Sequence, residues 1–596
     1  MSRSPIPDIP WQVTGNHWLS LPCIHPADGS IHALGMLHRG ARAAVEFAGH
    51  EHFLAGQGPA LLAPAITVDG DPVALAAQGL AWERALGWLP TFAATVGAES
   101  LVVRGSIFAP HGRDADSAGA VYVLAVENRG DRARRVSVAL EGALGHRQLR
   151  VRTPRPFGDA HRASVSADGI VILEGSALPG LVALAVAAED DAEVMVHDGA
   201  VPRFSLAHTV DLAPGESRSV AFYLAVGAER DAARAVAAVL RRRGWSELLS
   251  LTRESLAHLE QSVGHDGLDR LLNRNLLFAY FYGVGRALDD AHFYLVRTRT
   301  PSHALGVTVR DWEALSWTLP AVQLADVALA RELLLRVCEL HGYAPGSGVH
   351  YLDGNLFEPG FTLEGAAAYA LAVDRYIRES GDEQVVDEQV LAETLYLAWE
   401  DLAARRDAHV PLYSSEVSLA GEPLRRPFTL HGNAVVAQAL DVLRHTLDEE
   451  TAREVEDPEA VRAALRRHFG VEREGRVTFA AAVDLAGNVD DEHDALASAY
   501  WLPLYEAVEH HDSAYRRTVR ALATEPALLA AQCARLMGPD AGKVLQWLRR
   551  APLDNGIAAE MVDADGRAVA NGGDAAVAAL LAWSIWYAVH ALGVHP

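Results

Sequence analysis

Three glutamates lie in two long loops of the sequence, where paired carboxylates could carry out acid–base chemistry. Glu416 and Glu422 lie within residues 407–430, and Glu560 lies within residues 550–573. Long loops in a helical region are usually functional or disordered. A carboxylic acid can protonate a leaving group while a second carboxylate activates water. For Glu422 and Glu560 the alternative interpretation is an exposed loop carboxylate without a catalytic role.

Arg310 and Asp311 form a second polar group, at the start of a predicted helix. Arginine presents several fixed N–H donors and aspartate presents acceptor oxygens, so the pair could hydrogen-bond the hydroxyl groups of a sugar. Trp312 and Trp317 follow, and a tryptophan face can stack on a sugar ring, although a tryptophan in a helical core more often only packs. The alternative is that Asp311 caps the helix and Arg310 is solvated.

Tyr351, Asp353 and Glu364 are further candidates for substrate binding. Tyr351 could stack on a sugar ring as the tryptophans could, and the two carboxylates are additional candidates for an acid. Glu364 follows Thr362 at the start of a predicted helix. A helix cap and the helix dipole explain that pattern equally well.

The composition excludes several classes of partner. The 596 residues include 52 Lys and Arg and 77 Asp and Glu, a formal net charge of −25. Nucleic acids and anionic membranes are bound through clustered Lys and Arg, so neither is expected as a partner. The cysteines Cys23, Cys338 and Cys533 lie too far apart for a metal site or a disulfide framework. We expect no metal and no organic cofactor. We also expect a reducing, cytoplasmic location, because the cysteines are few and the N-terminus lacks a signal-peptide pattern.

The chain changes character near residue 230. Before this point, short β-type runs separated by Gly, Asn and Pro turns predict a large antiparallel β-sandwich of two sheets. The clearest runs are residues 100–108, 120–127, 135–140, 169–173 and 219–226. We therefore predict a sandwich domain at residues 1–229, a helical linker at 230–264 and a helical domain at 265–596. The sandwich is a candidate surface for a homodimer.

Apolar residues recur at helical spacing from about residue 265 onward. The predicted helices are 267–286, 312–323, 325–341, 363–380, 387–405, 431–446, 457–469, 495–508, 513–523, 526–537, 541–549 and 573–592. Residues 575–594 contain no Asp, Glu, Lys or Arg and are long enough to span a bilayer, but their Ala-rich composition and His590 favour a buried core helix. The predicted fold is α+β and multidomain, with an N-terminal sandwich followed by an (α/α)6 barrel.

The second half of the sequence resembles the six-hairpin glycosidases, especially the glucoamylase and glycogen-debranching-enzyme group. The matching motifs are Val309–Trp312 with Ser316-Trp317, Tyr351–Gly354 with Glu358–Phe361, Tyr413–Pro423 with Pro427–Thr429, and Asp554–Glu560 with Asp563–Gly566. The motifs are short, and it is their order along a helical region that carries the resemblance. It covers about residues 265–592.

The resemblance implies an exo-acting glycoside hydrolase for an α-glucoside or a related α-linked oligosaccharide. It places the general base at Glu560, in the loop before the last helix, and the general acid in the loop 407–430. We expect the acid to be Glu416, with Glu422 as the alternative, and we expect Arg310 and Asp311 to hold the terminal sugar. The implied mechanism is inverting, for which the two carboxyl groups stand about 6.5–9.5 Å apart.

Two other functions remain open. A disaccharide phosphorylase on the same architecture would use phosphate in place of water and would need a cationic or amide-rich pocket, for which Arg425 and Arg426 are candidates. A carbohydrate-binding protein with a degenerate barrel would keep the tryptophan contacts and lack one carboxylate. Whether two carboxylates face one pocket together with Arg310 and Asp311 distinguishes an enzyme from a binding protein.

Overall fold

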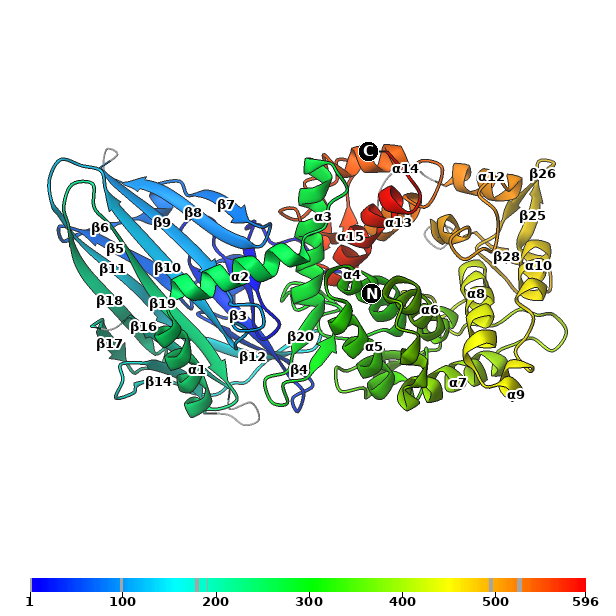
Figure 1. Cartoon of the computed structure of the whole chain (residues 1–596), viewed down its shortest axis with the longest axis horizontal. Helices are drawn as coiled ribbons and strands as arrows, with labels where there is room; N and C mark the ends of the chain where they lie inside the picture. The colour runs from blue at the N-terminus through cyan, green and yellow to red at the C-terminus, as the bar shows by residue number, and fades with distance from the viewer. Residues whose placement is uncertain are drawn as a thin grey trace.

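The computed structural model describes residues 3–96, 100–176, 182–189, 191–491, 497–522 and 528–595. It contains an N-terminal domain of β-sheets and a C-terminal region of helices, as the sequence predicts (Figure 1). The helices α1 (Arg230–Arg243) and α2 (Trp245–Leu259) follow the last sheet strand, and α2 extends from the sheets toward the helical region. The predicted boundaries near residues 229 and 264 lie between these elements and stay a prediction.

The described strands of the N-terminal domain pair antiparallel in three sheets, where the sequence predicts two. Their orders are β1-β2-β3-β4-β12-β13, β14-β15-β16-β19-β10-β9-β8-β7 and β17-β18-β11-β5-β6. The third sheet arises because β11 pairs with β5 and β18, whereas β12, which starts three residues later, pairs with β4. The strands are β1 (Gln12–Gly15), β2 (Ser20–Ile24), β3 (Ile31–His38), β4 (Ala43–Ala48), β5 (Ala63–Val68), β6 (Asp71–Val73), β7 (Ala81–Ala85), β8 (Leu89–Val96), β9 (Leu101–Phe108), β10 (Gly119–Asn128), β11 (Arg134–Ala143), β12 (His146–Arg150), β13 (Pro154–Pro156), β14 (His161–Val165), β15 (Val171–Gly175), β16 (Ala183–Ala188), β17 (Glu193–His197), β18 (Arg203–Leu212) and β19 (Ser217–Gly227).

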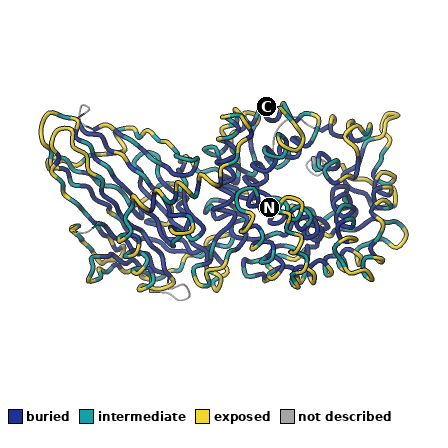
Figure 2. The backbone as a smooth tube through the Cα atoms, viewed as in Figure 1, coloured by how far each residue is buried: buried dark blue, intermediate teal, exposed yellow. Residues whose placement is uncertain are grey.

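Strand β10 shows how side-chain alternation builds this domain. Tyr122 and Leu124 point into a core shared by the three sheets, while Val121 and Val123 belong to a second core with Leu240 of α1. Successive side chains of a strand point to opposite faces, so a strand covered on both faces is apolar almost throughout. The dark strands in Figure 2 follow this burial, and the sheet is thereby joined through α1 and α2 to the core of the helical region.

The helical region begins with α3 and ends with α15. Its α-helices are α3 (Asp266–Phe278), α4 (Leu319–Ala325), α5 (Val327–His341), α6 (Leu363–Ser380), α7 (Gln389–Ala404), α8 (Leu430–Thr446), α9 (Glu449–Ala452), α10 (Pro458–Phe469), α12 (Ser513–Ala521), α13 (Leu529–Arg535), α14 (Ala541–Leu548) and α15 (Ala575–His590). Short β-hairpins and pairs lie between them, at β20 (Val284–Arg286), β21 (Phe293–Leu295), β22 (Gly348–His350), β23 (Leu356–Pro359), β24 (Phe428–Thr429), β25 (Gly470–Arg473), β26 (Arg476–Phe479), β27 (Ala482–Val483), β28 (Val489–Asp490), β29 (Ala559–Val562) and β30 (Ala568–Gly572).

Most of the predicted helices are confirmed to within a few residues. The prediction 363–380 coincides with α6, because the Thr362 side chain caps its first turn and Gly381 ends it in the left-handed region. The segments η3 (Ala279–Gly283) and η4 (Glu313–Thr318) are π-helical turns instead of α-helix. The predictions 495–508 and 526–537 begin at residues outside those described. Within the first of them, the described part is a 3₁₀ turn, η6 (Ala497–Trp501), followed by turns.

The apolar C-terminal segment is the core helix α15. Its side chains from Ala575 to Ile585 are buried, and α15 packs against α3, α4 and α13. The prediction of a core helix is therefore confirmed. Among the described helices, none combines the length and the apolar character needed to cross a membrane.

Candidate functional site

A cavity of about 580 Å³ lies among the loops and helix starts of the helical region. Its charged lining residues are Arg3, Arg297, Arg310, Arg375, Asp311, Glu313, Glu358, Glu364, Glu422, Asp490 and Glu560, and its aromatic lining residues are Trp312, Trp317, His431, Trp501, Tyr505 and Trp583. The volume is in the range of small-molecule sites. Among them, Glu364 and His431 lie in the first turns of α6 and α8. The N–H groups and the dipole at a helix N-terminus stabilise a carboxylate placed there.

Glu560 lies on β29, which forms a hairpin with β30, and its carboxylate lines the cavity. One carboxylate oxygen accepts a hydrogen bond from the Asn571 side-chain amide, and the other lies 3.3 Å from Nε of Arg3. The Glu560 side chain is 22% exposed, so it is sheltered but open to the cavity. Both carboxylate oxygens therefore have a donor that fixes their position.

Glu422 also lines the cavity, on a tight hairpin that faces it. The Ser418 amide donates to the Glu422 carbonyl at 2.8 Å, and a β-bridge joins Val417 to Pro423. Arg310 donates hydrogen bonds to the carbonyl groups of Leu419 and Ala420 at the tip of this hairpin. Arg310 thus lines the cavity and also holds the hairpin that carries Glu422.

The structure does not bring Glu416 to the cavity. Its carboxylate accepts a hydrogen bond from Arg405 at 2.6 Å and another from the Phe361 amide at 3.1 Å, and its side chain is 51% exposed. Arg405, and then the Phe361 amide, lower the pKa of Glu416. A general acid requires the opposite shift, because it must hold its proton near neutral pH. Glu416 therefore lacks the property of a general acid. Its contacts with Arg405 and the Phe361 amide instead anchor the loop that carries Glu422.

Asp311 lies at the cavity wall and is almost fully buried. It accepts a hydrogen bond from the Gly346 amide at 2.8 Å, and its second oxygen lies 3.4 Å from Nδ1 of His341. The His341 ring stacks on His350 at 4.6 Å between centroids. The Gly346 amide and His341 thus fix the Asp311 carboxylate. The next residue, Trp312, also lines the cavity.

Glu364 and His431 form a buried pair on the opposite helix starts of α6 and α8. His431 Nδ1 lies 3.0 Å from the Glu364 carboxylate. Trp312 packs edge-on against His431, and Tyr505 contacts both rings. All four line the cavity, and together they form an aromatic wall with one carboxylate.

A buried charge cluster lies at the start of α15. Arg297 donates hydrogen bonds to both carboxylate oxygens of Asp574, at 3.0 and 2.6 Å, and forms an ion pair with Glu313. His303 lies 3.1 Å from Asp574, which also caps α15 through the Val577 amide. Trp317 lies beside the cluster, with the Arg297 guanidinium 5.6 Å from its ring centre. The cluster fixes the cavity lining formed by Arg297, Glu313 and Trp317.

Tyr351 and Asp353 are not among the residues that line the cavity, and both contact the β domain. Asp353 accepts a hydrogen bond from Arg42 at 2.6 Å, and the Arg42 guanidinium lies over the Tyr351 ring at 5.6 Å. Arg425 and Arg426 are also absent from the described lining, and Arg426 pairs with Asp484 at 3.4 Å. Tyr351, Asp353 and Arg426 thus contribute to loop and domain contacts in the structure.

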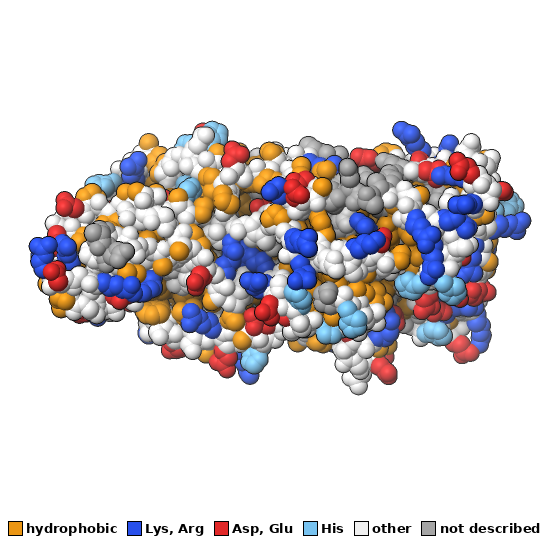
Figure 3. Space-filling model, turned by 90° about the horizontal axis from the view of Figure 1, so that it is seen from above, with side chains coloured by type: hydrophobic (Ala, Val, Ile, Leu, Met, Phe, Trp, Pro, Cys, Tyr) orange, Lys and Arg blue, Asp and Glu red, His pale blue; other side chains and the backbone are white. Residues whose placement is uncertain are grey.

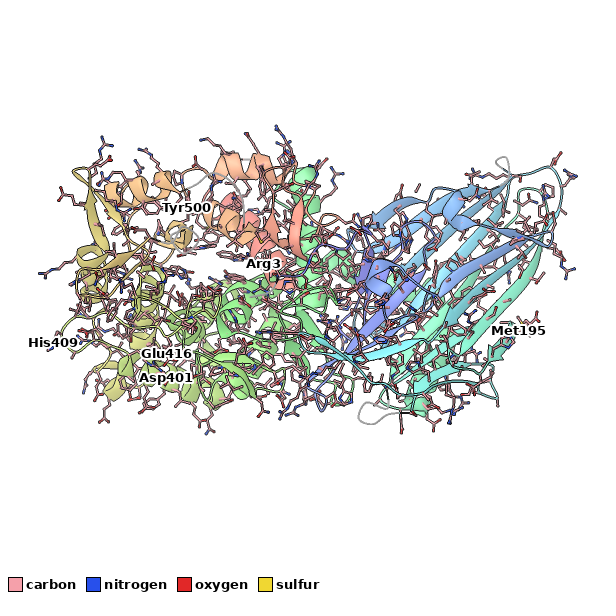
Figure 4. All side chains as sticks on the ribbon, turned by 180° about the vertical axis from the view of Figure 1, so that it is seen from behind. Arg3, Met195, Asp401, His409, Glu416 and Tyr500 are labelled. Carbon is pink, nitrogen blue, oxygen red and sulfur yellow. The ribbon has the colours of Figure 1, made fainter. Side chains whose placement is uncertain are left out.

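Sequence reasoning missed Arg3, Asn571, His431 and Asp574. His431 and Asp574 lie at helix starts, which is a signal that could have drawn attention to them. Arg3 is 557 residues from Glu560 and has no local signal. Figure 4 shows Arg3 in the middle of the helical region, whereas Glu416 lies on its lower side in that view. In Figure 3, basic and acidic side chains are interspersed over the face that the molecule presents to the viewer.

Asp554 precedes Glu560 in the same loop and gives a testable pH dependence of stability. Burial raises its pKa to about 6, although Arg274 acts in the opposite direction. The folded protein therefore keeps this proton at pH values where the unfolded chain has lost it. As a result, the contribution of Asp554 to the free energy of unfolding falls as the pH rises from the unfolded pKa of 3.8 to about 6.

We expect Asp554→Asn to remove this dependence. Relative to wild type, the variant should gain up to about 3 kcal/mol in unfolding free energy above pH ~6, and little near pH ~4. Urea unfolding of both proteins across this pH range measures the difference. A difference that does not change with pH would contradict the assignment.

Comparisons with known proteins give a fold but no family model. A scan against protein-family models and a search of curated proteins each find no match. Among solved structures, a putative kojibiose phosphorylase from the human microbiome matches with a TM-score of 0.61 at 10% identity, over 98% of this chain and 87% of that one. A bacterial glucoamylase in complex with acarbose matches with a TM-score of 0.59 at 9% identity, over 100% and 96% of the two chains. The chain shares the fold of these two proteins, which confirms the resemblance indicated by the sequence motifs at the level of the fold.

Proposed function

We propose that this protein is an exo-acting glycoside hydrolase that cleaves an α-linked oligosaccharide with inversion. One observation carries the proposal: Glu422 and Glu560, from different loops, line one cavity together with Arg310 and Asp311. A binding protein with a degenerate site would lack one of the two carboxylates. The two structural neighbours, named as a glucoamylase and a kojibiose phosphorylase, support a carbohydrate substrate.

Glu560 is the proposed general base. A base must be ionised and must hold a water molecule in line with the carbon that it attacks. The side-chain amide of Asn571 and the guanidinium of Arg3 each donate to one oxygen of the Glu560 carboxylate, and donors on both oxygens fix its orientation. Glu560 has this support in the lining of the cavity, where its side chain is partly exposed.

Glu422 is the proposed general acid, in place of Glu416. The two glutamates are six residues apart on the same loop, but only Glu422 lines the cavity. Arg310 holds the hairpin of Glu422 through its hydrogen bonds to the hairpin tip. Asp311 and Glu364 supply fixed acceptors for sugar hydroxyls in the same cavity. Trp312 and Trp317 supply ring faces for stacking.

The proposal includes the finer architecture. We propose that the three sheets pack as a sandwich and that the helices whose starts carry Asp311, Glu364, His431 and Asp574 form the inner ring of an (α/α)6 barrel. Support comes from the shared fold and from the position of Asp311, Glu364 and His431 around one cavity. Asp574 bonds Arg297, which also lines this cavity. A cytoplasmic location is proposed because Cys23, Cys338 and Cys533 are buried and unpaired.

The test of the function is sugar release from a panel of α- and β-linked oligosaccharides, with and without phosphate. Wild-type release without phosphate, with the opposite anomer appearing first in an NMR time course, is the expected result. Release that requires phosphate would instead identify a phosphorylase. An initial product of retained configuration would contradict the inverting mechanism, and binding without release would favour a carbohydrate-binding protein.

The choice between Glu422 and Glu416 has its own prediction. Glu422→Gln should lower kcat for a natural glycoside by about 10²- to 10⁴-fold, because the leaving oxygen no longer receives a proton. The loss should be much smaller for a glycosyl fluoride, since fluoride leaves without protonation. Glu416→Gln is the matched comparison on the same loop and should retain most activity on both substrates. The reverse pattern would assign the acid to Glu416.

A further inference from the structure

A segment near the N-terminus reaches across the molecule to the proposed active site. The backbone N–H of Ser4 donates to the side-chain oxygen of Asn571 at 2.7 Å, and the backbone N–H of Asn571 donates to the Ser4 carbonyl at 2.9 Å. A β-bridge joins Pro5 to Ala570. Residues 3–5, which we call the strap, therefore run alongside β30. Strand β30 in turn pairs with β29, which carries Glu560.

The strap places a cation on the proposed general base. Arg3 lines the cavity, and its Nε lies 3.3 Å from one oxygen of Glu560. Asn571, which the strap binds from the other side, donates to the second oxygen. The carboxylate is thus held between one donor from the strap and one donor that the strap itself fixes. A free glutamate side chain has several rotamers, and two donors on two oxygens select one of them.

We propose that Arg3 is a positioning residue that holds Glu560 in the orientation in which it activates water. The inference rests on the proposed function of Glu560 and extends it to a residue far away in the sequence. Its chemistry is that of orientation: the guanidinium keeps the carboxylate oxygen directed at the attacking water, and the reaction moves no proton to or from Arg3. Small misplacements of a reacting group reduce rates strongly, so loss of this contact should appear in kcat.

The test compares Arg3→Gln and Arg3→Lys with wild type on the oligosaccharide that the panel identifies. We expect Arg3→Gln to lower kcat by about tenfold or more, with KM changed less than about twofold, because substrate binding is not its role. Arg3→Lys should retain part of the lost activity through its charge. Adding guanidinium ions to Arg3→Ala should restore part of kcat, which a purely structural role of Arg3 would not allow.

Arg104→Gln is the matched control. Arg104 pairs with Glu127 at 2.9 Å and is 48% exposed, compared with 45% for Arg3, but it lies on β9 of the β domain. Arg104→Gln should leave kcat and KM unchanged. Arg104→Gln and Arg3→Gln should each melt within a few degrees of wild type.

The outcomes separate this proposal from the proposed function. An active wild type whose kcat is unchanged in Arg3→Gln would overturn the role of Arg3 alone, and so would a rise in KM at constant kcat. A wild type that releases no sugar from any substrate would overturn the proposed function, and the role of Arg3 with it.

Discussion

Glu560→Gln is expected to lower kcat for sugar release by about 10²- to 10⁴-fold, the usual contribution of general acid–base catalysis. Glutamine has nearly the same shape but cannot accept a proton from the attacking water. The substitution keeps one side-chain oxygen, which can accept from Asn571, while the amide NH2 group replaces the oxygen that accepts from Arg3. The hairpin of β29 and β30 should remain in place, because its two strands pair through their backbones. KM should change little, because the substrate is held by other residues of the cavity.

Steady-state kinetics on the substrate found in the panel measure this effect. Glu449→Gln is a suitable control, since Glu449 is an exposed ion-paired glutamate of α9. Activity of Glu560→Gln within a few-fold of wild type would remove Glu560 from the mechanism. In that case another carboxylate in the cavity wall, such as Asp490, would have to act as the base.

Local sequence signals predict most of the helices and two parts of the site at helix starts, Glu364 and the pair Asp311-Trp312. The cap at Thr362 and the glycine at Gly381 define α6, and that boundary places Glu364 at its first turn. The same reasoning identifies Asp311 and Trp312, because they precede a helical segment that lines the cavity. A residue at the first turn of a packed helix has little freedom in where its side chain points.

Long-range pairing decides the remaining assignments. Which of Glu416 and Glu422 faces the cavity depends on the Glu416 amide bonding the Phe361 carbonyl and on Arg310 holding the hairpin tip. Neither contact leaves a pattern within the loop sequence. The position of Arg3 depends on pairing across more than 550 residues, which periodicity cannot report. Tyr351 and Asp353 carry sugar-binding side-chain types, yet their turn lies against the β domain.

Asp574→Asn is expected to destabilise the protein by about 3–5 kcal/mol, because it leaves the buried Arg297 without its main counter-charge. Asp574 is fully buried and accepts hydrogen bonds from Arg297, the Val577 amide and, at 3.1 Å, His303. Asparagine caps a helix about as well as aspartate, so the loss should come from the charge. Asp512→Asn is the matched control, since Asp512 caps α12 through the Tyr515 amide at 2.8 Å without such an arginine, and it should change stability by less than about 0.5 kcal/mol.

The pH dependence of this difference tests its electrostatic origin. Burial alone would raise the pKa of Asp574, but Arg297 and His303 lower it well below its ordinary value. The stability that Asp574 contributes is therefore present above the unfolded pKa of 3.8 and is lost as the pH falls below it toward the folded pKa. Urea unfolding should show the full difference between wild type and Asp574→Asn near neutral pH and a smaller one below pH ~4. A difference that stays constant into acid, or one below about 1 kcal/mol at neutral pH, would mean that Arg297 relies on Glu313 instead.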